Sequence, residues 1–78
     1  MMAYIAKAYY MAHNDRWNDM LRVANAGLAI NSSAAALLAA RGFAENKLGR
    51  YDDGASDIQQ ARKLSPHDPD VMVFAVGW

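Results

Sequence analysis

The residues of this chain that could take part in chemistry are few, and they are scattered along the sequence. His13 and His67 are its two histidines, and they lie in different halves of the chain. A helical metal site groups its ligands at spacings of three or four residues, which these two histidines do not share. The segment Asp52-Asp53-Gly54 is the part most similar to a calcium loop. It lacks the alternating acids and the closing Glu of such a loop, so we interpret it as the acidic start of a helix.

The same scatter argues against covalent catalysis and phosphate binding. The glycines stand at 27, 42, 49, 54 and 77, so they form no glycine-rich phosphate loop. The serines stand at 32, 33, 56 and 65, and none has a basic partner that the sequence itself reveals. The sequence therefore predicts a protein that is not an enzyme and that needs no cofactor.

Composition narrows the possible partners. The chain has 78 residues, with eight basic and eight acidic side chains and a formal net charge of zero. Nucleic-acid binding requires a basic face, which this balance does not supply. No run of about 18 apolar residues is present, and the N-terminus lacks the basic start and apolar core of a signal peptide. We therefore expect no nucleic acid and no membrane insertion; the location is not determined by the sequence, and the missing signal peptide favours the cytoplasm. The absence of cysteine excludes disulfides and thiolate metal sites.

The pattern of apolar residues predicts an all-α fold, because β-branched residues are sparse and never alternate with polar ones. We expect five helices, at roughly 2–13, 17–30, 34–48, 52–64 and from 69 to the end of the chain. Asn31-Ser32-Ser33 offers stop chemistry after the second helix and N-cap chemistry for the third, and Gly49 ends the third helix. Asp68 is the expected N-cap of the fifth helix, with Pro69 in its first turn.

The chain repeats itself weakly at a shift of 34 residues. The shift aligns Arg16-Trp17 with Arg50-Tyr51, Asp19 with Asp53, and Ala6 with Ala40. Few positions are identical, but residue size and polarity recur. We expect Trp17 and Tyr51 to plug the turn between the two helices of each unit, because each ring begins a second helix.

A helix-turn-helix period of 34 residues resembles the tetratricopeptide repeat. The unit 35–68 is the better match, and its matching positions are Leu38, Arg41-Gly42, Ala44, Gly49-Arg50-Tyr51, Ile58, Ala61, Leu64 and Pro66. It departs from the pattern at Glu45, where a Tyr is usual, and at Gly54, where an Ala is usual; close helix packing is our interpretation of Gly54. The unit 1–34 matches less well, at Tyr4, Ala8, Trp17, Ala24 and Ile30. Residues 69–78 resemble the first helix of an incomplete third unit. The resemblance implies antiparallel helix hairpins stacked as a short right-handed solenoid.

Such solenoids bind partners in a concave groove formed by the first helix of each unit. The resemblance places in that groove Met2, Ile5, Tyr9, Ala12 and His13 of the first unit, and Ala36, Ala39, Phe43, Asn46 and Lys47 of the second. One group of these proteins grips a terminal carboxylate with Lys, Asn and Arg. Ile5, Tyr9, Ala40, Val73 and Gly77 stand at those places, so this clamp is absent. The remaining apolar wall suits a helix or an extended apolar peptide. The alternative is that Tyr9 and Phe43 only fill space or meet a neighbouring chain.

The last segment, "VMVFAVGW", is apolar on every side and cannot bury all its side chains against one neighbour. Two explanations stand beside each other: the chain is part of a longer repeat array, or it associates with itself through this end. Val73, Phe74 and Trp78 are the residues we expect in such self-association. The leading hypothesis is thus a non-catalytic protein-interaction module. The alternative is a structural spacer or self-association segment of a larger repeat protein.

Overall fold

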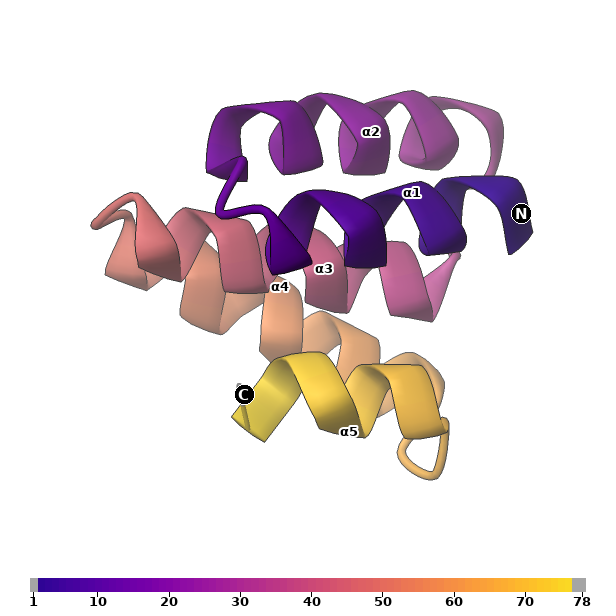
Figure 1. Cartoon of the computed structure of the whole chain (residues 1–78). Helices are drawn as coiled ribbons and strands as arrows, with labels where there is room; N and C mark the ends of the chain where they lie inside the picture. Colours follow the sequence, from indigo (N-terminus) through magenta and orange to yellow (C-terminus); the bar gives the residue numbers. More distant parts are fainter. Residues whose placement is uncertain (1, 77–78) are drawn as a thin grey trace.

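The structure is a computed structural model that describes residues 2–76 as five α-helices joined by short turns (Figure 1). The helices are α1 (Met2–His13), α2 (Trp17–Ile30), α3 (Ala35–Lys47), α4 (Tyr51–Leu64) and α5 (Pro69–Val76). This range contains no strand. The prediction of an all-α chain with five helices is confirmed, and the first four helices begin and end within one residue of the expected bounds. Gly77 and Trp78, on which part of the sequence-based expectations rest, lie outside the described residues.

Three of the four expected helix ends are confirmed, and one is wrong. Asn31 follows α2 as its C-cap, and its backbone N–H donates to the Gly27 carbonyl oxygen. Gly49 follows α3 with a φ of 84°, in the left-handed region that favours glycine. At α5, the Asp68 carboxylate accepts a hydrogen bond from the backbone N–H of Asp70 at 2.9 Å, as an N-cap does. At α3, however, Ala34 occupies the cap position and makes no side-chain cap bond. The Asn31 side chain instead accepts the backbone N–H of Ser33 at 3.1 Å, so it stabilises its own turn before the helix begins.

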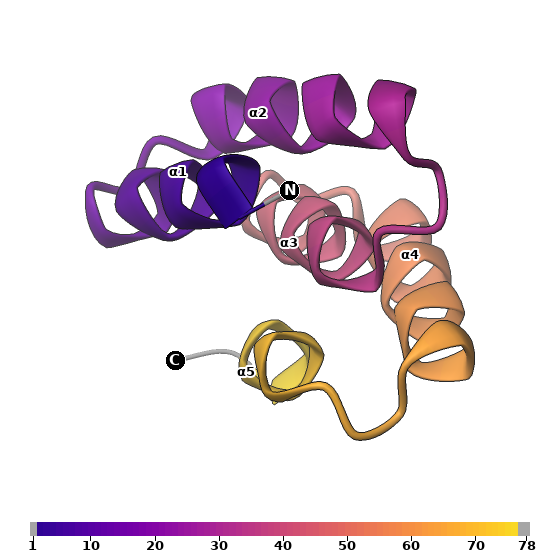
Figure 2. The same cartoon turned by 90° about the vertical axis from the view of Figure 1, so that its right-hand side faces the viewer.

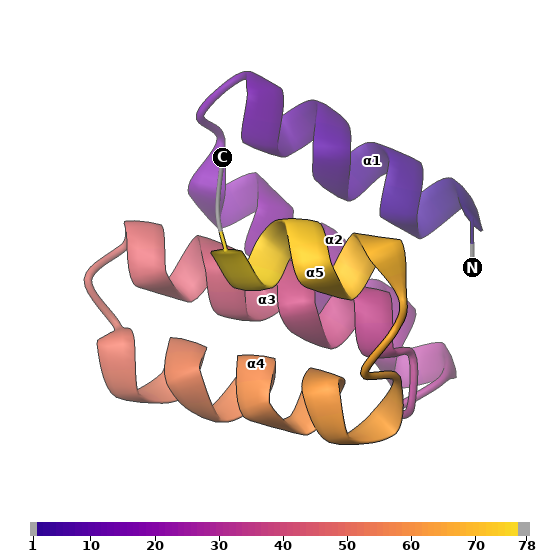
Figure 3. The same cartoon turned by 90° about the horizontal axis from the view of Figure 1, so that it is seen from below.

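The helices form two curved layers around α3. In Figure 2, α1, α3 and α5 follow one another along the inner side of the curve, and α2 and α4 lie on its outer side. Helix α3 packs against each of the other four helices. Figure 3 shows α5 lying along α3, between α1 and α4. The centre of the molecule is therefore one helix, and nine of its thirteen residues are buried.

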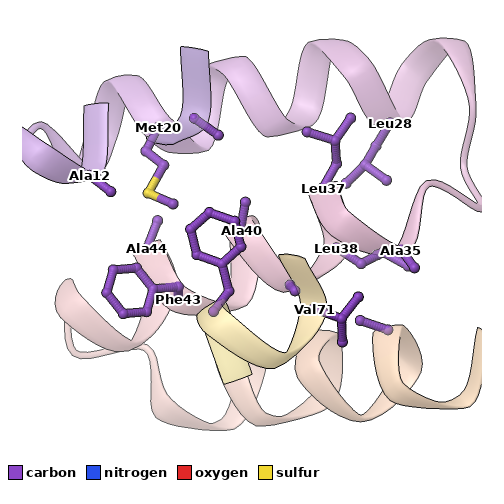
Figure 4. Packing of buried hydrophobic residues seen from close by; sticks show 14 residues of the cluster. Ala12, Met20, Leu28, Ala35, Leu37, Leu38, Ala40, Phe43, Ala44 and Val71 are labelled. Carbon is purple, nitrogen blue, oxygen red and sulfur yellow. The ribbon is translucent and has the colours of Figure 1, made fainter. Parts of the chain in front are cut away.

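The core consists of the apolar side chains that surround α3 (Figure 4). Leu37 and Ala40 of α3 are fully buried, as are Met20 of α2 and Val71 of α5. Alanine is common in this core, so the helices approach one another closely. Burial of these apolar surfaces is the main favourable contribution to the stability of so small a chain.

Two glycines mark the closest approach, between α3 and α4. A Cβ atom added at Gly54 would lie 2.8 Å from the carbonyl oxygen of Gly42, and one added at Gly42 would lie 2.8 Å from that of Gly54. Both distances are shorter than an ordinary contact between these atoms. The interpretation of Gly54 as a site of close helix packing is therefore confirmed.

The two aromatic residues expected at the hairpin turns differ in their surroundings. Trp17 is half-buried and packs edge-on against Phe43, with ring centroids 5.7 Å apart. The prediction for Tyr51 is wrong, because its side chain is 69% exposed. The reason lies in the neighbours: Trp17 begins a helix that packs on both α1 and α3, and its ring reaches Phe43 there. Tyr51 is the first residue of α4, and its side chain projects into solvent.

Candidate functional site

The surface formed by α1, α3 and α5, which we call the inner face, carries a row of aromatic rings. Tyr9 of α1 stacks on Phe74 of α5, with ring centroids 4.7 Å apart and planes inclined by 29°. Phe74 lies 5.7 Å from Phe43 of α3, and Phe43 in turn meets Trp17 at the start of α2. Four rings from four helices therefore pack in one continuous row. Ring pairs in this distance range contribute about 0.5–1.5 kcal/mol each beyond the area they bury.

A hydrogen bond holds Tyr9, which forms one end of this row. The Tyr9 hydroxyl donates to a carboxylate oxygen of Asp70 at 2.5 Å, across 61 residues of sequence. Burial, followed by the hydrogen bond and the negative charge of Asp70, raises the pKa of Tyr9 well above its usual value. The hydroxyl therefore remains protonated and continues to donate to α5. This bond and the stacked pair bring α1 and α5 together although their backbones do not pack directly.

A lysine lies at the other end of the row. The Lys47 ammonium lies 5.4 Å from the ring centroid of Phe43 and 5.7 Å from that of Trp17. Both distances are within the range of cation–π attraction. The side chain is exposed, so the positive charge remains accessible to a partner. The inner face thus has an apolar, aromatic centre with a cation at one end and the Tyr9–Asp70 pair at the other.

In the structure, the predicted groove residues differ in their exposure to solvent. His13, Lys47 and Met2 are exposed, Met2 by 75%. Ile5, Tyr9 and Asn46 are half-buried. The buried positions are Ala12, Ala36, Ala39 and Phe43, the last only 5% exposed. These buried residues form the floor of the inner face, and a partner cannot reach Phe43 while α5 packs over α3.

The predicted self-association residues also differ in their exposure to solvent. Val73 is half-buried, whereas Phe74 is 1% exposed and belongs to the aromatic row. Phe74 therefore packs within the chain, because α5 folds back onto α3 and α1. Trp78 lies outside the described residues. The most exposed apolar side chains of α5 are instead Met72 and Val76.

Sequence reasoning missed a polar cluster on the outer side of α3. The Arg41 guanidinium donates two hydrogen bonds to the Asp57 carboxylate of α4, both at 2.8 Å, and a third to the Asn25 side chain of α2 at 3.1 Å. Asp57 and Asn25 each stand 16 residues from Arg41, so no local spacing could have revealed the cluster. Burial alone would raise the pKa of Asp57, but the paired Arg41 outweighs it and lowers that pKa. The cluster links α2 and α4 across α3.

Glu45 adjoins this cluster, one turn after Arg41. Its Oε1 atom is buried and accepts no hydrogen bond. Burial, followed by the neighbouring Asp57, raises the pKa of Glu45 to about 8, although Arg41 opposes the shift. Below that pH the protonated, uncharged form predominates. Glu45 stands where the resemblance expects a Tyr, and this departure was the one signal in the sequence that the position is unusual.

Neither a metal centre nor a membrane span emerges from the described residues. Across 2–76, no three His, Asp or Glu side chains gather as ligands of an ion would. Within the same range, no helix combines the length and the apolar character needed to cross a membrane. The groups that do gather in this range are aromatic rings, a lysine and a charged cluster.

Comparisons with protein-family models, with curated proteins and with solved structures find no significant match. The arguments about function therefore rest on the geometry of this chain.

Proposed function

We propose that this chain is a non-catalytic protein-interaction module that binds a helix or an extended peptide on its inner face. The observation that carries the proposal is the aromatic row, which is assembled from four helices and half-exposed at Tyr9 and at Trp17. Rigid aromatic surfaces supply large contact area at low entropic cost, which favours their use in recognition. The similarity of the 34-residue period to tetratricopeptide repeats supports the same function.

The surroundings of the row suggest the chemistry of the partner. Met2 and Ile5 extend the apolar surface along α1, and Lys47 places a cation beside the rings of Phe43 and Trp17. A partner segment with apolar side chains on one side and a carboxylate near Lys47 would satisfy both features. In this proposal the helices belong to repeat units 1–34 and 35–68, followed by the first helix of a third, and stack as a right-handed solenoid.

Site-specific photo-crosslinking tests the proposal. A photoreactive phenylalanine analogue at Met2 should capture one protein reproducibly from a cell extract. The same group at Gln60, which is exposed on α4, is the matched control and should not capture that protein. Replacing Ile5 by Glu in the Met2-labelled chain should abolish the crosslink, because a charge would be buried against the apolar partner.

Phe43→Ala is unsuitable for this test, because Phe43 belongs to the core and its loss would destabilise the fold. Equal capture from Met2 and Gln60, or a Met2 crosslink that survives Ile5→Glu, would contradict binding on the inner face.

A further inference from the structure

An uncovered apolar surface lies on the side of α5 next to α4. Met72 is 56% exposed and Val76 is 79% exposed, and they stand one helical turn apart on the same side of α5. A cavity of about 280 Å³ opens beside them, lined by these two residues and by Arg62, Pro66, Val71 and Ala75. We call this surface the end face. Apart from Arg62, its lining is apolar.

The internal repeat indicates what kind of element covers such a surface. A shift of 34 residues places Met72 on Leu38 and Val76 on Gly42. Both of these α3 residues are buried, and Gly42 faces Gly54 and Ile58 of the antiparallel helix α4. A second shift leads to α1, where Tyr4 faces Gly27 of the antiparallel helix α2. The same face is therefore covered by an antiparallel helix on α1 and on α3, whereas within residues 2–76 it is uncovered on α5, where Met72 and Val76 are exposed.

The same comparison of α5 with α3 explains the cavity. Ala75 corresponds to Arg41, whose side chain extends between α2 and α4 and bonds to both of them. Ala75 has no atoms beyond Cβ, so the corresponding space beside α5 is left unfilled. The end face consequently carries a protruding side chain, Met72, directly beside a hollow that can receive one.

We propose that the end face binds the end face of a second copy of this chain, with the two α5 helices antiparallel about a twofold axis. A surface that carries a knob and a hole side by side is self-complementary under such an axis, because each Met72 enters the cavity of the other copy. The antiparallel arrangement reproduces the way α2 covers α1 and α4 covers α3. It also leaves the inner face of both copies accessible, so this inference does not depend on the proposed function.

Charge favours this pairing. Asp70, the acidic residue of α5, is held by Tyr9 on the opposite side of the helix and does not line the cavity. Arg62 stands at the end of α4, close to the start of α5. An antiparallel copy would bring the C-terminal end of its own α5 toward this arginine. The C-terminal end of a helix carries partial negative charge, so it attracts a cation.

Sedimentation equilibrium of the full chain tests the proposal. The surface is small, so we expect weak association, with the average mass rising toward that of two chains between about 10 μM and about 1 mM. Met72→Glu should weaken the association at least tenfold, whereas Met72→Leu should preserve it. Met2→Glu is the matched control, since Met2 is also an exposed methionine but lies on the inner face, and it should leave the association unchanged. Circular dichroism should show the same helix content in all four proteins.

Disulfide trapping tests the orientation, because the chain contains no cysteine of its own. In an oxidised equimolar mixture of Met72→Cys and Val76→Cys chains, random pairing gives twice as many mixed disulfides as either like pair, and the antiparallel arrangement predicts mixed disulfides well above that twofold ratio. A single-chain mass over the whole concentration range would overturn the proposal and leave the end face to a helix of another protein. A mass that passes beyond two chains, an equal loss in Met2→Glu, or mixed disulfides at or below that twofold ratio would overturn it as well.

Discussion

Gly54 shows at the scale of one residue how closely α3 and α4 approach. Alanine is the better helix former by about 1 kcal/mol, so Gly54→Ala would stabilise an isolated helix. In the folded chain, however, the added Cβ would lie 2.8 Å from the Gly42 carbonyl, which is backbone and cannot turn aside. Overpacking of this kind costs about 1–3 kcal/mol. We therefore expect Gly54→Ala to lower the free energy of unfolding by about 1 kcal/mol in urea titrations. Ser56→Ala, at an exposed position of the same helix, is the control and should change the free energy of unfolding by less than about 0.5 kcal/mol. A Gly54→Ala chain that is more stable than the parent would refute the steric argument.

Glu45 should make stability depend on pH. Its pKa is raised from about 4.5 in the unfolded chain to about 8 in the folded chain, so the folded state binds more protons between these values. Raising the pH through this range should therefore lower the free energy of unfolding. Glu45 is only partly shielded from solvent, so we expect a loss on the order of 1 kcal/mol rather than the full equivalent of the shift.

Chemical denaturation at pH 5 and pH 8 measures this loss. Glu45→Gln, which keeps the shape and removes the charge, should abolish most of the difference and should be more stable than the parent at pH 8. Asp52→Asn removes an exposed carboxylate from α4 and should preserve the difference. If the parent chain were instead more stable at pH 8 than at pH 5, Glu45 would not be the group that determines how stability changes between these pH values.

At the scale of elements, local sequence signals were sufficient to define the helices. Apolar periodicity, Gly49 after α3 and the Asp68 cap before α5 each act within a few residues, and each was readable from the sequence. The burial of Phe43 and Phe74 was not readable, because it depends on α5 folding back over α3. The Tyr9–Asp70 bond joins residues 61 apart, and no pattern in the sequence pairs them.

The attachment of α5 to α1 can be measured through Tyr9. Tyr9→Phe keeps the ring stacked on Phe74 and removes the hydrogen bond to Asp70, a loss of about 1 kcal/mol. Tyr9→Ala removes both. Hydrogen–deuterium exchange should show α5 amides exchanging about fivefold faster in Tyr9→Phe and much faster in Tyr9→Ala, with smaller changes in α4. Tyr10→Ala is the neighbouring control, because Tyr10 is exposed and lies outside the aromatic row. Equal protection of α5 in all three variants would show that Tyr9 does not hold it.

At the scale of the whole molecule, the chain is organised around α3. Each of the other helices packs against α3, whereas α1 and α4, α2 and α4, and α2 and α5 do not pack on one another. In a stack where each element contacts only its neighbours, stability is transmitted through the shared element. A perturbation of α3 should therefore reach both ends of the molecule, and one confined to α5 should remain local.

Leu37→Ala and Val71→Ala compare these two cases with residues that are both fully buried. Leu37 lies in α3, where it packs against Gly27 of α2, and its truncation should cost about 2–5 kcal/mol. Because α3 supports all the other helices, hydrogen exchange should accelerate in each of them, and the midpoint of unfolding should move to lower denaturant. Val71 lies in α5, so its truncation should accelerate exchange chiefly in that helix and leave α1 and α2 protected. If Val71→Ala weakened α1 and α2 as strongly as Leu37→Ala does, the five helices would unfold as one cooperative unit, and the central role of α3 would be excluded.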